Sequence, residues 1–209
     1  MSSYRAPLDE MAFVQNELAG LAQIATLPGC SDADPATVAA ILAEAGKFAT
    51  DVLEPLNRTG DRSSTRLLED GSMRTAAGFK DAYWKFVEGG WNGLGKNPEF
   101  GGQGLPEIVA SAVEEMWHAS NMAFDLCPML TQGAIEAIER NGSDELKQRY
   151  LPNMVSGHWT GTMNLTEPQA GSDLAAVRTR AVPQPDGTYL VTGQKIFITY
   201  GEHDLAENI

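Results

Sequence analysis

MNLTEPQAGSD, at Met163–Asp173, is the most informative stretch of this chain. Within it, Pro168 fixes its own φ, while Gly171 permits a positive φ or the close approach of a ligand. Ser172 and Asp173 can cap backbone amides or bind a polar ligand. The stretch therefore predicts a turn that presents N–H groups and hydroxyls to something flat and polar.

A second stretch, QKIFITYG at Gln194–Gly201, is β-branched and aromatic with a two-residue alternation. This pattern predicts a strand from Lys195 to Tyr200. One face of that strand would carry Phe197 and Thr199. The opposite face would carry Ile196, Ile198 and Tyr200.

Together the two stretches resemble the flavin-binding face of the acyl-CoA dehydrogenases, a family in which TEPxAGSD is a specific motif. The resemblance implies FAD as cofactor and places the Thr166 hydroxyl at flavin N5 and O4. It also implies that Ser172 lies near the pyrophosphate and touches the pantetheine arm of the acyl-CoA substrate. Carried over position by position, the implied FAD contacts are Met163, Leu165, Thr166, Gly171, Ser172, Phe197 and Thr199, with methionine at 163 where many relatives have an aromatic residue.

The resemblance extends over essentially all 209 residues. The glycine-rich run from Gly90 to Pro106 resembles the GW…PEEYGGQGLP segment of the same family, and we interpret it as mainly structural. Residues 4–14 and 198–209 resemble the long branch of the family that includes the 3-methylmercaptopropionyl-CoA dehydrogenases, which carries an extra leading segment.

Apolar periodicity predicts a bundle of six helices before about residue 155. The first is expected over 7–25, and the second opens at Asp34-Pro35, an N-cap followed by proline at the first helical position. Ser143 should start the last one. The other three are expected over 75–88, 106–120 and 123–140.

After Gly157 the pattern changes to strand alternation. Strands are expected over 158–165, 177–182, 188–192 and 195–200, with a hairpin turn at 184–187. The fold class is therefore α+β and multidomain: a helical bundle followed by the first part of a β-barrel. We expect an extension helix at 1–33, a helical domain at 34–156 and a truncated barrel domain at 157–209.

The 15 basic and 28 acidic residues give a net charge of −13, which opposes binding to nucleic acid or to an anionic membrane. The chain has no apolar run long enough to span a bilayer and no signal-peptide core, so a cytoplasmic location is expected. Cys30 and Cys127 are too few for a disulfide framework.

The resemblance implies α,β-dehydrogenation of an acyl-CoA, with electrons passing to an electron-transfer flavoprotein, and a homo-oligomer that is a dimer or tetramer. The catalytic glutamate belongs to a C-terminal helical domain that is absent here, so the base is expected beyond residue 209 and the fragment is expected to be inactive alone. The alternatives are an acyl-CoA oxidase and a non-catalytic acyl-CoA or flavin-binding scaffold.

Other ionisable residues favour structural interpretations. Glu167 is expected to act as a cap or salt-bridge partner rather than as a base. Glu114 and Glu115 are expected on the solvated face of a helix. The three histidines are dispersed, and Glu202-His203-Asp204 lacks further ligands at suitable spacing, so no metal site is predicted.

Overall fold

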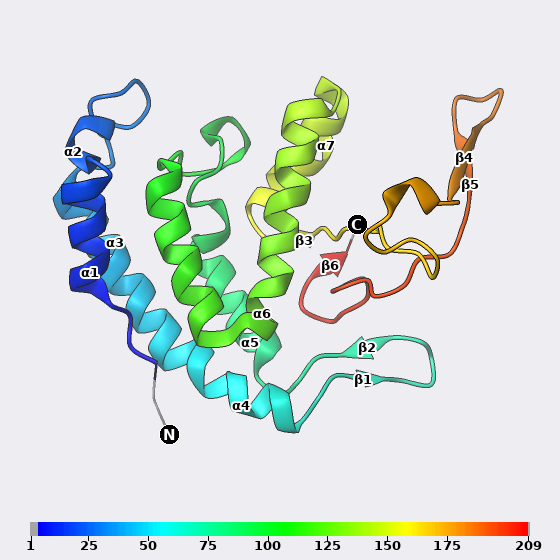
Figure 1. Cartoon of the computed structure of the whole chain (residues 1–209), viewed down its shortest axis with the longest axis horizontal. Coiled ribbons are helices and arrows are strands. Elements are labelled where there is room, and N and C mark those ends of the chain that lie inside the picture. Colours follow the sequence, from blue (N-terminus) through cyan, green and yellow to red (C-terminus); the bar gives the residue numbers. More distant parts are fainter. Residues whose placement is uncertain (1–3, 209) are drawn as a thin grey trace.

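Helices dominate the chain up to Val155, and short strands and turns make up the rest (Figure 1). The structure, a computed structural model, describes residues 4–208. Residues 1–3 and 209, which belong to the expected segments 1–33 and 157–209, lie outside the described residues. Within the described part no helix is both long and apolar enough to cross a membrane.

The expected first helix over 7–25 is broken into three pieces. These are α1 (Leu8–Phe13), the π-helix η1 (Val14–Leu18) and α2 (Leu21–Ile24). Gly20, with φ 71°, interrupts the path, because a left-handed residue cannot continue an α-helix. The prediction of one continuous helix was therefore wrong.

The second helix forms where its cap predicts. The Asp34 side chain accepts hydrogen bonds from Ala36 N (3.0 Å) and Thr37 N (3.2 Å), and Pro35 is the first helical residue. The chain then stays helical through α3 (Pro35–Phe48), the π-helix η2 (Ala49–Leu53) and α4 (Glu54–Arg62).

A short hairpin that the sequence pattern did not predict follows α4. Its strands are β1 (Arg66–Leu67) and β2 (Met73–Arg74), and they pair antiparallel. Next come α5 (Phe79–Glu88) and the short 3-10 helices η3 (Trp91–Gly93) and η4 (Pro98–Phe100).

The glycine-rich loop around η4 uses its backbone groups internally. Gln103 N donates to Gly93 O (2.8 Å), and Gly104 N donates to Lys96 O (2.9 Å). A Cβ at Gly102 would lie 2.0 Å from the Lys96 carbonyl oxygen, so only glycine fits there. The structural interpretation of this loop is confirmed.

Helix α6 (Glu107–Asn141) contains the two helices expected over 106–120 and 123–140, joined at a kink. Asn121 has φ −157° and ψ 83°, and its Oδ1 accepts from Phe124 N (3.0 Å), which caps the second arm. Figure 1 shows the chain turning back at this kink. Helix α7 (Asp144–Val155) begins after the Ser143 cap, as predicted.

The main core lies between these helices. Its largest buried aromatic residues pack ring to ring; for example, the Phe86 and Phe124 centroids are 6.0 Å apart in a T-shaped arrangement. A smaller cluster packs between the second arm of α6, α7 and η4; its buried members are Phe100, Ile135, Leu151, Met154 and Val155.

Beyond α7 the described residues form paired strands but no closed barrel. β3 (Trp159–Thr160) pairs parallel with β6 (Glu207–Asn208), and β4 (Arg180–Pro183) pairs antiparallel with β5 (Tyr189–Thr192). The 3-10 helix η5 (Leu174–Ala176) lies between them in sequence. The hairpin turn at 184–187 is confirmed, since Gly187 has φ 84° and Gln184 N donates to Thr188 O (2.8 Å).

Two strand predictions fail here. Only Trp159–Thr160 of the expected strand 158–165 is extended and paired. The expected strand 195–200 is irregular and ends in a turn at 199–200, because Phe197 (φ 56°) and Tyr200 (φ 51°) take left-handed backbone conformations that no strand contains.

Candidate functional site

Backbone and side-chain hydrogen bonds join the turn at 163–173 to the segment 194–201. Ile196 N donates to Thr166 O (3.0 Å), and the Thr162 hydroxyl donates to Thr199 O (2.5 Å). Lys195 Nζ donates to Leu165 O (3.0 Å). The two stretches, 30 residues apart in sequence, thus lie side by side even though the second is not a strand.

The turn itself closes on a small hydrogen-bonded loop. Glu167 N donates to Ala170 O, and Ala170 N donates to Glu167 O, both at 3.0 Å. Asp173 accepts from Ala175 N (3.1 Å) and starts η5, which confirms its expected capping role. Gly171 does not take a positive φ, but no atom lies within 4 Å of where its Cβ would be.

A buried ion pair holds this turn in place. The Glu167 side chain, in a residue only 3% exposed, accepts from Lys195 Nζ (2.8 Å). It also accepts from Thr179 Oγ1 (2.6 Å) and from the backbone N–H groups of Arg178 (2.8 Å) and Thr179 (3.0 Å). The lysine contact above all, followed by these other donors, lowers the pKa of Glu167 well below its ordinary value. Glu167 is therefore a salt-bridge residue, as expected, and a poor proton acceptor.

Several predicted contact residues are exposed apolar side chains. Phe197 is 86% exposed and Met163 is 61% exposed, and Leu165 is also exposed. Large apolar side chains are rarely exposed together in a folded protein unless they contact another molecule. The residues predicted to face the flavin thus include the most exposed large apolar side chains of the two joined segments.

Exposed and partly buried side chains alternate between the two faces as expected, although the segment is not a strand. Phe197 and Thr199 are exposed, whereas Ile196, Ile198 and Tyr200 are partly buried. Phe197 carries its ring on a left-handed residue, a conformation that costs energy for a bulky side chain and is enriched at functional sites. Of the remaining predicted residues, Gly171 and Ser172 are exposed, and Thr166 is partly buried.

Two side chains of the run Glu202-His203-Asp204 have partners within the protein. Leu205 N donates to His203 Nδ1 (3.2 Å), so the ring's other nitrogen carries the proton and donates to Thr160 Oγ1 (2.9 Å). Burial lowers the pKa of His203 and keeps it neutral. Asp204 accepts from the backbone N–H (3.0 Å) and hydroxyl (2.7 Å) of Thr75.

Sequence reasoning missed two features of the molecule. Lys195 was not singled out as the partner of Glu167, although a lysine inside an apolar segment was the available signal. Glu114 is only partly exposed and lies with His118 and Asp125 in one cluster, which corrects its assignment to a solvated face. The four-residue spacing of Glu114 and His118 on one helix was the signal for that cluster.

Comparison with protein families gives two matches. The family described as acyl-CoA dehydrogenase, N-terminal domain, matches residues 35–158, and the family described as acyl-CoA dehydrogenase, middle domain, matches residues 162–206.

Among curated proteins, the chain is 46% identical over 207 residues to 3-methylmercaptopropionyl-CoA dehydrogenase of Ruegeria pomeroyi. The match covers 99% of this chain and 35% of that relative, so the chain spans about a third of its length.

Two solved structures illustrate the shared fold. One concerns the electron transferring flavoprotein of Acidaminococcus fermentans and flavin-based electron bifurcation; it matches with a TM-score of 0.66 and 28% identity, over 78% of this chain and 40% of the other. The other is an FAD complex of PigA, with a TM-score of 0.62 and 25% identity over the same shares.

Proposed function

Because this chain belongs to the acyl-CoA dehydrogenase family, we propose that the protein containing it oxidises an acyl-CoA thioester at its α and β carbons with FAD. The observation that carries the proposal is that the two motif segments lie side by side, joined by the hydrogen bond from Ile196 N to Thr166 O. Both segments carry exposed apolar side chains. The names of the relatives, an acyl-CoA dehydrogenase and an FAD complex among them, support the same chemistry.

The residues present fit a flavin. The exposed Met163, Leu165 and Phe197 offer an apolar surface to a flat ring. The open space in front of Gly171 allows the backbone to approach a ligand, and Ser172 beside it supplies an exposed hydroxyl for a phosphate. We accordingly assign the ring contacts to Met163, Leu165, Thr166, Phe197 and Thr199, and the pyrophosphate to Gly171 and Ser172.

A bound FAD would supply the hydride acceptor for the β-hydrogen of the thioester. This chain contributes orientation and polarity. The Thr166 hydroxyl would hydrogen-bond the reacting edge of the ring, and Ser172 would hold the pantetheine arm. Joining the two segments before the cofactor arrives lowers the entropic cost of forming the site.

The α-proton requires a carboxylate base, and Glu167 does not qualify. Its side chain is engaged by Lys195 and Thr179, and its pKa is lowered, so it would accept a proton poorly at neutral pH. We therefore assign the base to a glutamate outside residues 1–209. By this assignment residues 1–209 alone would not turn over acyl-CoA.

We further propose domain boundaries near residues 33 and 156, an electron-transfer flavoprotein as electron acceptor, a homo-oligomeric state, a role in fatty acid metabolism and a cytoplasmic location. The similarity to the Acidaminococcus fermentans structure supports the choice of acceptor. The two unpaired cysteines agree with a reducing compartment.

The direct test is an anaerobic titration of FAD-loaded full-length protein with a panel of acyl-CoA thioesters, following the flavin absorbance. Bleaching by at least one thioester is expected. If none of the thioesters bleaches the flavin, the protein is a non-catalytic scaffold and the proposed activity is wrong. Steady peroxide production in air would instead identify an oxidase.

The role of Thr166 gives a sharper prediction. Thr166→Ala in the full-length protein should slow flavin reduction by about two- to tenfold, because one hydrogen bond is worth roughly 0.5–1.5 kcal/mol. Thr166→Ser keeps the hydroxyl and should restore most of the rate. Stopped-flow absorbance measures both, and an unchanged rate in the alanine variant would remove the assigned role.

A further inference from the structure

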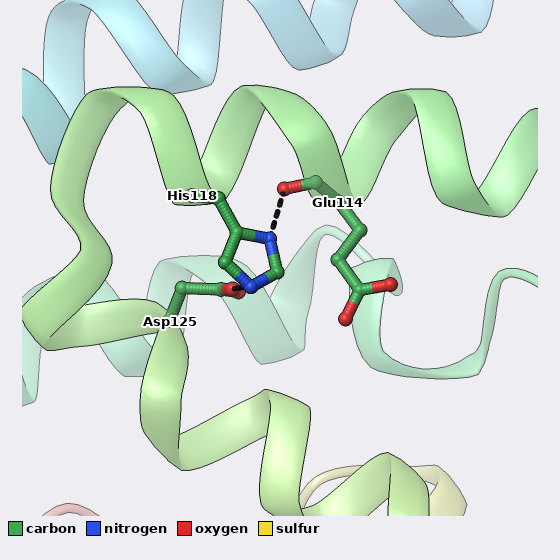
Figure 2. Close-up of side chains that lie close together, drawn as sticks. All are labelled: Glu114, His118 and Asp125. Atoms are coloured by element: carbon green, nitrogen blue, oxygen red, sulfur yellow. Dashed lines mark hydrogen bonds and ion pairs between the residues drawn. The ribbon is translucent and has the colours of Figure 1, made fainter.

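Three ligand-type side chains meet at the kink of α6 (Figure 2). Glu114 and His118 come from the first arm and Asp125 from the second. One oxygen or nitrogen atom from each lies within 4.8 Å of the other two. The kink at Asn121 brings the second arm back against the first, so residues seven apart in sequence reach one point.

The hydrogen bonds of His118 fix which nitrogen carries a proton. Nδ1 lies 3.0 Å from the backbone carbonyl oxygen of Glu114, which can only accept, so Nδ1 must be the donor. Nε2 therefore faces Asp125 Oδ2, 3.0 Å away. An imidazole held through Nδ1–H on a carbonyl, with Nε2 directed at carboxylates, is the arrangement found in metal-binding histidines.

Asp125 is a buried carboxylate with one close partner at its Oδ2. The residue is 1% exposed, and its Oδ2 makes no hydrogen bond of good geometry besides the ion pair with His118. A buried carboxylate oxygen with so few donors around it can accept a cation as a further partner.

The cluster opens onto a cavity of about 700 Å³ between the two arms of α6 and η3. Glu114 and Asp125 line it, and so does Gln132, whose buried Oε1 also has no hydrogen-bond partner. The charged residues lining the cavity are five acidic and two basic: Glu107, Glu114, Asp125, Glu136 and Glu139 against Lys96 and Arg140. The cavity thus offers the unpartnered Gln132 oxygen and an excess of acidic side chains, both of which favour a cation.

We propose that Glu114, His118 and Asp125 bind a divalent cation of the zinc class, with its remaining coordination position open to the cavity. One imidazole and two carboxylates suit zinc and its first-row neighbours better than magnesium, which prefers oxygen ligands only. Three protein ligands with one open position are typical of zinc sites that also bind a small molecule.

The test is isothermal titration of chelator-treated full-length protein with Zn²⁺. One ion per chain is expected. His118→Gln and Asp125→Asn should each weaken binding by more than about tenfold, since even loss of an outer-shell partner costs 10–100-fold in metal affinity. His158→Gln is the matched control, because His158 is exposed and bonded to Ser156, and it should leave affinity unchanged.

Glu114→Gln is a second variant that should keep the fold, because Glu114 is only partly buried. Circular dichroism checks that this variant is folded. It should also weaken zinc binding. Equal affinity and stoichiometry in the folded His118→Gln or Glu114→Gln variants and in the wild-type protein would overturn the proposal. In that event His118 and Asp125 serve only as an ion pair that braces the kink.

Discussion

At the scale of single residues, the Glu167–Lys195 pair determines how the candidate flavin contacts are held. The carboxylate ties the turn at 163–173 to the backbone at Arg178 and Thr179, and the lysine ties it to the following segment. The sequence motif predicted the acidic residue's structural role, because glutamate beside a proline turn commonly caps. It could not predict the partner, since 28 residues separate Glu167 from Lys195.

Glu167→Gln should lower the stability of the full-length protein, because it leaves Lys195 without its carboxylate and weakens every bond to the turn. The effect should depend on pH. The pKa of Glu167 is lowered in the folded state, so its stabilisation is fully present above the ordinary carboxyl pKa of about 4.3 and is lost as the pH falls toward the folded value.

Thermal unfolding at pH 7 and at pH 4 measures this effect. The difference between wild type and variant should shrink at the lower pH. Glu69→Gln, at an exposed position in the turn between β1 and β2, is the control and should change neither curve. A Glu167→Gln variant as stable as wild type at pH 7 would contradict the structural role.

At the scale of elements, local sequence signals predicted where helices begin and end, but they did not predict the conformation of every segment. The caps at Asp34 and Ser143 hold because each side chain bonds a backbone amide two or three residues away. The segment 195–200 has the pattern of a strand, yet Lys195 and Ile196 bond to the turn at 163–173 and Phe197 turns left-handed. Tertiary contacts overrode β propensity there.

The kink in α6 depends on a single buried residue. Asn121 Nδ2 donates to Leu53 O (3.0 Å), and its Oδ1 accepts from Phe124 N (3.0 Å). Asn121→Ala would leave both backbone groups buried without these partners, which costs about 1–3 kcal/mol each. Urea denaturation of the full-length protein should show that loss, whereas the exposed neighbour Met122→Ala should change stability by less than about 0.5 kcal/mol.

If Asn121→Ala and Met122→Ala prove equally mild, the kink is held by core packing and not by the asparagine. Such a result would also weaken the proposed cation site, because that site requires both arms of α6 to stay in their present relation.

At the scale of the whole molecule, the residues after Thr199 fasten the flavin-motif segments to the helical part. The Tyr200 hydroxyl donates to Ala123 O (2.6 Å), and Trp159 Nε1 donates to Glu207 Oε2 (2.8 Å). Thr75 donates twice to Asp204, across 129 residues of sequence. The order of helical and strand segments could be predicted from periodicity, but these long-range bonds carry no local signal.

Comparing Asp204 with Asp186 separates the effect of a long-range contact from that of a local one. Each accepts a backbone N–H (3.0 Å) and a hydroxyl (2.7 Å) from a threonine, Thr75 for Asp204 and the adjacent hairpin residue Thr188 for Asp186. Asp204→Asn should destabilise the full-length protein by about 1–2 kcal/mol, because both hydrogen bonds from Thr75 lose the charged acceptor that strengthens them. Asp186→Asn should cost less, and the reverse order in chemical denaturation would contradict the docking role.

The central claim is that the joined segments 163–173 and 194–201 receive FAD. The most direct measurement is the FAD dissociation constant of the full-length protein carrying Ser172→Asp, compared with Ser31→Asp at an exposed position before α3. A carboxylate at Ser172 should weaken FAD binding at least about fivefold, because two like charges about 4 Å apart repel by roughly 1 kcal/mol even in water. The Ser31→Asp protein should bind FAD as the wild type does, and a Ser172→Asp protein that does the same would contradict the assignment of this surface to the cofactor.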